Sequence, residues 1–146
     1  MTTPLAGTEI AERIKANFPE AVIQGNKTEI LLNRDSIADV ARFLNRTPGL
    51  DFNYLVNLTG VDYFDYLEVV YHLQSLTHNH SVVIKTRCYD RDNPSVPSVI
   101  DIWRGADFQE REVYDLLGIR FDGHPNMKRI FLWEGFRGHP LRRDYL

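Results

Sequence analysis

The sequence contains a single cysteine, Cys88, among its 146 residues. An iron–sulfur cluster is commonly held by about four thiolates, so the chain is not expected to hold a cluster by itself. A disulfide framework is excluded for the same reason. Cys88 ends a run rich in Val and Ile, residues 82–88, which predicts a strand with a small buried thiol.

A long apolar run is also lacking. The richest stretch, residues 55–76, is interrupted by Asn57, Asp62, Asp65 and Glu68, whereas a membrane span needs about 20 apolar residues. Residues 1–7 lack the basic and apolar regions of a signal peptide. We therefore expect membrane association only through a partner. The net charge of −3 offers no broad basic surface for nucleic acid.

Motifs that bind nucleotides or activate nucleophiles are absent. The sequence has no Gly-x-Gly-x-x-Gly and no Gly-x-Ser-x-Gly. Gly118 and Gly123 have P-loop spacing, but His124 and Pro125 follow where Lys and Ser or Thr are needed. His78 and His80 could share one strand face, yet no nearby Cys or acidic residue completes a metal site. We expect no cofactor, no metal and no active site on this chain.

The hydrophobic patterns predict an α+β fold. Two amphipathic helices are indicated by apolar residues at helical spacing: Ile10, Ile14 and Phe18 in the first, and Ile37, Val40, Ala41 and Leu44 in the second. Between them, residues 21–24 and 28–32 predict a hairpin. Residues 52–58, 67–76 and 81–89 predict strands that pair antiparallel, and residues 90–97 predict a loop. Residues 1–105 form the expected core domain, with N-terminal helices and hairpin packed on a mainly antiparallel sheet.

Residues 106–146 are expected to form a motif helix and an extended arm, within a single structural unit with the core. Asp107 and Glu110 have the spacing of a capping box at the start of a helix over residues 107–117. Arg111 lies four residues before Asp115 and can pair with it. Gly118 can end the helix in a left-handed conformation.

The arm carries two Gly-His-Pro triplets, residues 123–125 and 138–140, and each leads to a basic pair. Aromatic residues interleave with the charges at positions 131, 133, 136 and 145. Two interpretations remain open. Arg and aromatic residues are favoured in protein interfaces, but an ordered tail packed on its own domain also fits.

This region resembles the thirty-kilodalton subunit of respiratory complex I, the C subunit of NADH–quinone oxidoreductases, and its relatives. The matching residues, which we also predict to form the partner interface, are Glu110, Arg111, Glu112, Tyr114, Asp115, Gly118, Phe121, Gly123, His124, Pro125, Arg129, Gly138, His139, Pro140, Arg142, Arg143 and Asp144. Ile119 and Ile130 also fit the family pattern.

The resemblance implies a non-catalytic structural subunit in the peripheral arm of an NADH–quinone oxidoreductase. It implies a hetero-oligomer in which the chain packs beside the large hydrogenase-like subunit, near the quinone site. The parent complex carries FMN, iron–sulfur clusters and quinone, and couples electron transfer from NADH to proton translocation. The implied location is peripheral, on the cytoplasmic side of the energy-transducing membrane.

Two alternatives stay open. One is the equivalent subunit of a membrane-bound hydrogenase or of a ferredoxin- or deazaflavin-linked dehydrogenase. The other is a small hydrolase that uses Glu110 or Glu112 as a base with His124. Against the hydrolase, Gly123 and Pro125 fix a backbone corner, which explains the motif without catalysis.

Overall fold

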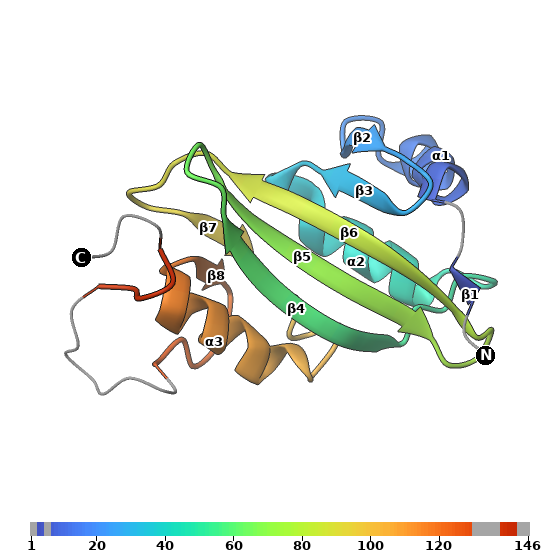
Figure 1. The fold of residues 1–146 in the computed structure, drawn as a ribbon. Helices are drawn as coiled ribbons and strands as arrows, with labels where there is room; N and C mark the ends of the chain where they lie inside the picture. Colours follow the sequence, from blue (N-terminus) through green and yellow to red (C-terminus); the bar gives the residue numbers. More distant parts are fainter. Residues whose placement is uncertain (1–2, 5–6, 130–137, 143–146) are drawn as a thin grey trace.

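A mixed sheet forms the centre of the protein (Figure 1). The computed structural model describes residues 3–4, 7–129 and 138–142. In spatial order, the main sheet consists of β2 (Val22–Gly25), β3 (Glu29–Leu32), β6 (His80–Cys88), β5 (Leu67–Ser75) and β4 (Tyr54–Asp62), with β1 (Thr3–Pro4) beside β6. The β4–β5, β5–β6 and β2–β3 pairs are antiparallel, as predicted, whereas β3 and β1 each run parallel to β6.

Side chains alternate between the two faces of this sheet. Along β6, Val82, Ile84, Thr86 and Cys88 are buried, and the residues between them are partly exposed. A strand turns successive side chains to opposite faces, so this pattern means that one face meets the core. The prediction that Cys88 is a buried core residue is confirmed.

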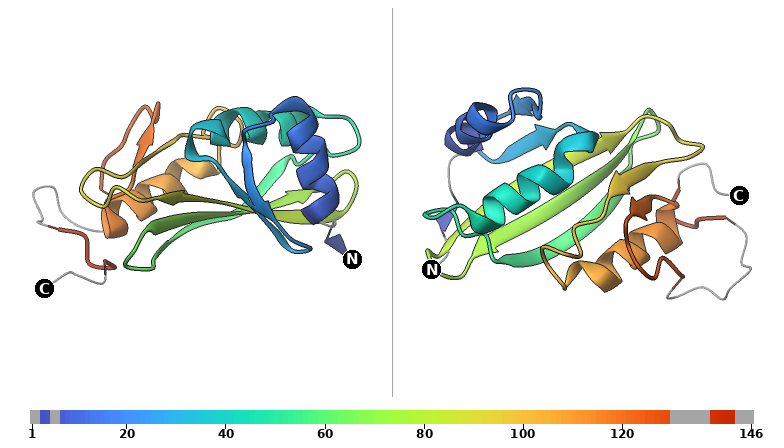
Figure 2. Two further views of the ribbon diagram at one scale, coloured as in Figure 1. Left: turned by 90° about the horizontal axis from the view of Figure 1, so that it is seen from above. Right: turned by 180° about the vertical axis from the view of Figure 1, so that it is seen from behind.

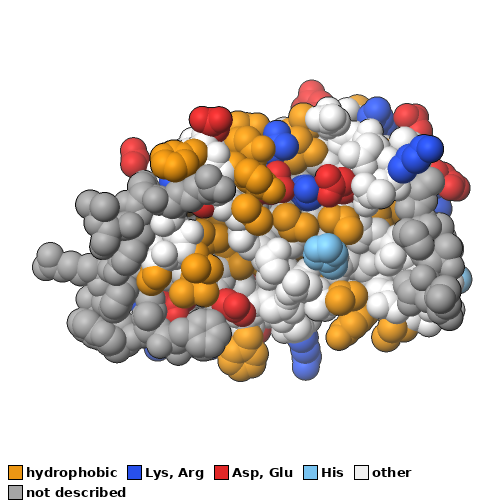
Figure 3. All heavy atoms as spheres, in the orientation of Figure 1, with side chains coloured by type: hydrophobic (Ala, Val, Ile, Leu, Met, Phe, Trp, Pro, Cys, Tyr) orange, Lys and Arg blue, Asp and Glu red, His pale blue; other side chains and the backbone are white. Residues whose placement is uncertain are grey.

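Helices cover the inner face of the sheet. The three α-helices are α1 (Gly7–Asn17), α2 (Ile37–Arg46) and α3 (Ala106–Leu117), and a short 3-10 turn, η1 (Arg34–Ser36), precedes α2. The apolar stripe of α2 is fully buried, as predicted. Figure 2 shows α2 and α3 on the same side of the sheet, and Figure 3 shows the opposite side, where apolar side chains reach the surface. The arrangement confirms the α+β fold.

A second, two-stranded sheet joins the motif region to the core. It pairs β7 (Ser95–Pro97) in parallel with β8 (Arg120–Asp122). The prediction of a loop over residues 90–97 is therefore wrong for residues 95–97. Three residues are too few to show a strand period, and parallel pairing links segments far apart in sequence.

Helix α3 packs closely against the edge strand β4. A Cβ atom at Gly60 would lie 2.5 Å from Cδ1 of Leu117 and 3.0 Å from Cγ1 of Val113, so the glycine permits this approach. Gln109 accepts a hydrogen bond from the backbone N–H of Leu58 and so occupies part of the strand edge. Within the described part of the chain, no helix combines the length and apolar character of a membrane span.

Candidate functional site

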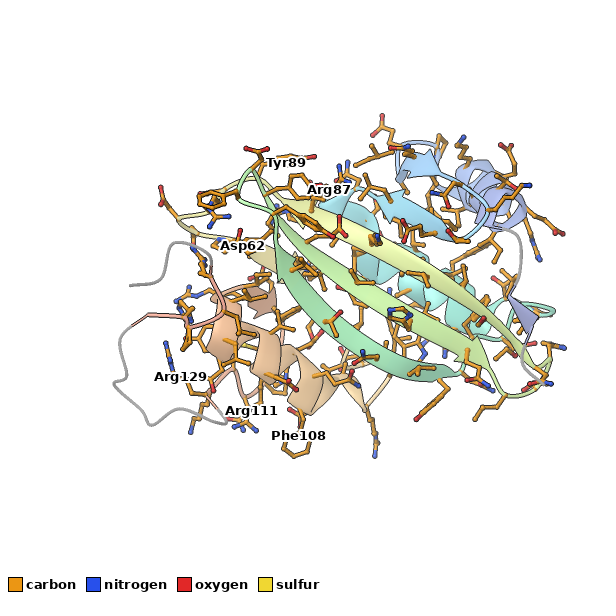
Figure 4. The ribbon with its side chains drawn as sticks, viewed as in Figure 1. Asp62, Arg87, Tyr89, Phe108, Arg111 and Arg129 are labelled. Carbon is orange, nitrogen blue, oxygen red and sulfur yellow. The ribbon has the colours of Figure 1, made fainter. Side chains whose placement is uncertain are left out.

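The motif residues that the structure describes gather around α3 and the segments after it (Figure 4). Glu110 does not cap the helix. Its completely buried carboxylate accepts hydrogen bonds from Oγ of Ser98 (2.6 Å) and from the backbone N–H of Val99 (2.9 Å). The N-cap residue is Gly105, which has no side chain to cap the helix, so the capping-box prediction is wrong. Burial raises the pKa of Glu110 to about 7.

Asp115 pairs with Arg129 and not with Arg111. Nη1 of Arg129 lies 3.3 Å from Oδ1 of Asp115, whose side chain is fully buried. Arg111 donates instead to the backbone carbonyls of Lys128 (3.1 Å) and Arg129 (3.4 Å). The predicted pair is therefore wrong, because a cation from the folded-back chain reaches Asp115. Both arginines fasten residues 128–129 to α3.

The two Gly-His-Pro triplets attach the chain to opposite ends of α3. Nε2 of His124 lies 3.0 Å from Oδ1 of Asp107 in the first turn. Nδ1 of His139 lies 3.0 Å from the carbonyl oxygen of Asp115 near the last turn. Burial lowers the pKa of His139. The neutral imidazole therefore donates its Nδ1–H to this carbonyl.

Glycines permit this close docking. Gly118 ends α3 with φ of 80°, which confirms the predicted left-handed residue. A Cβ atom there would lie 2.6 Å from Cδ2 of His139. Gly123 and Gly138 also have positive φ angles, 90° and 84°, in the two triplets. These conformations favour glycine, as the sequence indicated.

Arg142 caps the carboxyl end of α3. Its Nε donates to the carbonyl of Leu117 (2.6 Å), and its Nη1 donates to the carbonyl of Arg91 (2.8 Å). The backbone N–H of Leu141 donates to the carbonyl of Leu116 (2.9 Å). These bonds satisfy carbonyls that have no partner inside the helix. Residues 138–142 thus pack on their own domain. Arg143, Asp144, Ile130 and the arm aromatics at 131, 133, 136 and 145 lie outside the described residues.

The remaining motif residues divide between the interior and the surface. Phe121 is buried, Tyr114 and Pro140 are partly exposed, and Glu112 and Pro125 are exposed. The sequence analysis missed two exposed apolar residues, Phe108 (66% exposed) and Leu141 (59% exposed). Phe108 lies off the apolar stripe of α3, a signal that was available in the sequence. The guanidinium carbon of Arg111 lies 5.8 Å from the Phe108 ring centroid. We call Phe108, Arg111, Glu112 and Leu141 the docking face.

The residues considered for catalysis or metal binding have other partners. Glu110 binds residues 98–99, His124 binds Asp107, and Glu112 faces solvent. Nε2 of His78 lies 2.6 Å from Asp51, and Nε2 of His80 lies 2.8 Å from the carbonyl of Leu50. Among the described residues, no group of three or more His, Cys, Asp or Glu could hold a metal ion.

Comparison with known proteins gives a consistent result. The family model described as "Respiratory-chain NADH dehydrogenase, 30 Kd subunit" matches residues 30–146. The C subunit of the NADH-quinone oxidoreductase of Roseiflexus sp. (strain RS-1) is 42% identical over 147 residues, covering 96% of this chain and 84% of that protein. The C/D subunit of the NADH-quinone oxidoreductase of Phocaeicola vulgatus is 50% identical over 103 residues, covering 70% of this chain and 20% of that protein.

A solved structure is similar as well. It is that of the membrane-bound sulfane sulfur reductase, an archaeal respiratory membrane complex. The similarity covers 88% of this chain and 77% of the matched chain, with a TM-score of 0.68 and 27% sequence identity.

Proposed function

Because the chain belongs to the family of the 30 kDa subunit of respiratory-chain NADH dehydrogenase, we propose that it is a non-catalytic structural subunit in the peripheral arm of a complex I-type NADH–quinone oxidoreductase. In this role it docks on the large hydrogenase-like subunit near the quinone site. It supports electron transfer from NADH to quinone, coupled to proton translocation, without taking part in the chemistry. Its position is peripheral, on the cytoplasmic side of the membrane.

The composition of the docking face carries the proposal for the contact. Glu110, Asp115, Arg129 and Arg142 are engaged inside the chain. They therefore build a rigid surface, while Phe108 and Leu141 project from it. Exposed aromatic and aliphatic side chains beside an arginine are typical anchors of protein interfaces. The C/D relative, of which this chain covers 20%, supports a permanent neighbour for such a surface.

The absence of a cofactor on this chain is part of the proposal. Thiolate, not thiol, binds iron and other soft metals. Burial raises the pKa of the one cysteine, Cys88, to about 11, so it is protonated at neutral pH. FMN, the iron–sulfur clusters and quinone are then held by other subunits. Purified chain should show neither flavin nor cluster absorbance, and stoichiometric iron would contradict the proposal.

A charge placed on the docking face tests the contact. Phe108→Glu should release the tagged chain from the large subunit in solubilised native membranes and lower NADH–quinone turnover. Ile23→Glu is the matched control, because Ile23 is 60% exposed on β2, away from α3. Both purified variants should melt like the wild type. Equal retention of both variants in the complex would show that the docking face is not the contact.

The solved structure favours one alternative. Its match belongs to a respiratory complex that is a sulfane sulfur reductase. The chain could serve the same structural role in a related assembly, such as a membrane-bound hydrogenase or a ferredoxin- or deazaflavin-linked dehydrogenase. Identification of the subunits that co-purify with the tagged chain, together with assays for NADH and ferredoxin oxidation, distinguishes these complexes.

A further inference from the structure

A group of exposed aromatic rings lies at the turn between β4 and β5, away from the docking face. Tyr63, Phe64 and Tyr89 are 44%, 56% and 65% exposed. Tyr66 lies between them, with its ring centroid 5.3 Å from that of Tyr63 and 5.5 Å from that of Tyr89. We call these four residues the aromatic tip. Figure 4 shows Tyr89 and Arg87 at the opposite side of the view from Phe108 and Arg111.

Buried charges hold the aromatic tip in place. Arg91 forms two bonds to Asp62, of 2.6 and 2.9 Å, and the Asp62 side chain is 1% exposed. Oδ1 of Asp62 also accepts a hydrogen bond from the backbone N–H of Phe64 (2.8 Å). On the other side, Arg87 bonds to Glu68 and lies 4.3 Å from the Tyr66 ring centroid. The rings are therefore fixed before any partner binds, which reduces the entropy lost on binding.

Phe64 adopts an unusual backbone conformation. Its φ is 75°, in the left-handed region that bulky residues rarely occupy. Asn would fit this region with less strain. Folding of the domain gains nothing evident from a strained phenylalanine that is 56% exposed. Such strain is typical of functional positions.

The charge around the rings indicates what would bind. Arg87 and Arg91 are matched by Glu68 and Asp62. Asp65 and Asp92 are exposed, and no Lys, Arg or His in the described residues pairs with either carboxylate. The surface thus combines aromatic faces with unpaired negative charge. Aromatic faces attract cations, and carboxylates pair with them.

We propose that the aromatic tip is a second docking surface, which binds a Lys- or Arg-rich segment of another subunit of the complex. With the docking face, it would let this small chain bridge two partners. The surface is unsuited to anionic lipid because its free charges are negative. The proposal depends on the proposed function only in requiring a multi-subunit complex.

Phe64→Asn separates docking from folding. Asn preserves the left-handed turn, so the purified variant should melt no lower than the wild type. Loss of the ring should make the chain dissociate at least about tenfold faster from one neighbour in the solubilised complex. Tyr54→Ala is the control, since Tyr54 is a similarly exposed aromatic residue (47%) at the other end of β4. Wild-type dissociation of Phe64→Asn would overturn the proposal.

The partner's chemistry is tested separately. A photo-cross-linking phenylalanine analogue at position 89, in native membranes, should attach to a Lys- or Arg-rich segment of another subunit. Asp65→Asn with Asp92→Asn should weaken that contact and reduce its salt sensitivity, whereas Glu20→Gln should not. Adducts only to lipid, to a second copy, to this chain's own residues or to an acidic segment would overturn the proposal. Because Phe108→Glu tests a different contact, failure of one surface is distinguishable from failure of the other.

Discussion

Arg129 binds both the motif helix and the second Gly-His-Pro triplet. Its Nη1 lies 3.3 Å from Oδ1 of the buried Asp115, and its Nη2 donates to the carbonyl of Gly138 at 2.7 Å. One guanidinium therefore joins two segments that are separate in sequence. This contact explains why a basic residue follows the first triplet: it neutralises a carboxylate that would otherwise be buried alone.

Removal of the Asp115 carboxylate should destabilise the isolated chain. Loss of one member of a buried ion pair leaves the other charge uncompensated and costs about 3 kcal/mol or more. Asp115→Ala should lower the free energy of unfolding by roughly this amount in urea titrations. Asp39→Ala is the control, because Asp39 pairs with Arg42 on the exposed surface. Equal effects would mean that the buried pair contributes no more than a surface pair.

Arg142 should contribute to folding as well as to any contact with a partner. Its guanidinium satisfies the carbonyls of Leu117 and Arg91. Arg142→Ala should lower the free energy of unfolding by about 1–2 kcal/mol. It should also speed hydrogen exchange of the Leu141 amide, which bonds to Leu116. Arg120→Ala is an exposed control on β8. Unchanged exchange at Leu141 would show that Arg142 does not hold this segment.

The sequence predicted features that depend on local periodicity. The α2 stripe of Ile37, Val40, Ala41 and Leu44, the antiparallel strands and the Gly118 helix end were all correct. Each follows from spacing along one element. The family motif was recognised for the same reason, since its residues are close in sequence.

Partners of charged side chains were not predictable in this way. Glu110 was assigned to its own helix, but Ser98 and Val99 reach it from an earlier segment. Asp115 was assigned to Arg111, yet Arg129 arrives from a chain reversal after β8. Helical spacing lists the neighbours that a residue has in an isolated helix. It does not include cations or donors that tertiary folding brings from elsewhere.

Gly118 should be less tolerant of substitution than another glycine of similar conformation. Gly118→Ala combines the strain of a positive φ, about 1 kcal/mol, with a clash against the His139 ring. Gly49→Ala has only the strain, because φ is 90° and nothing lies within 4 Å of the added Cβ. Gly118→Ala should therefore lower the melting temperature more than Gly49→Ala. Equal losses would indicate that His139 moves away without cost.

Glu110 should make the chain less stable as pH rises. Burial raises the pKa of its carboxyl from 4.5 to about 7. Between these values the folded chain binds a proton on Glu110 that the unfolded chain has lost. The free energy of unfolding therefore falls as pH increases through this window. At about 1.4 kcal/mol per pH unit, the full effect above pH 7 is about 3 kcal/mol.

Glu110→Gln isolates this effect, because the neutral amide imitates the protonated acid and can still accept the hydrogen bond from Val99. The variant should match the wild type near pH 4.5 and exceed its free energy of unfolding above pH 7. His139 acts in the opposite direction, since its lowered pKa makes protonation on acidification unfavourable to folding. That contribution is common to both proteins and cancels in their difference. Urea titrations across the window measure the difference curve. A curve that is flat with pH would show that Glu110 has the same pKa in both states, and that Ser98 and Val99 fully offset its burial.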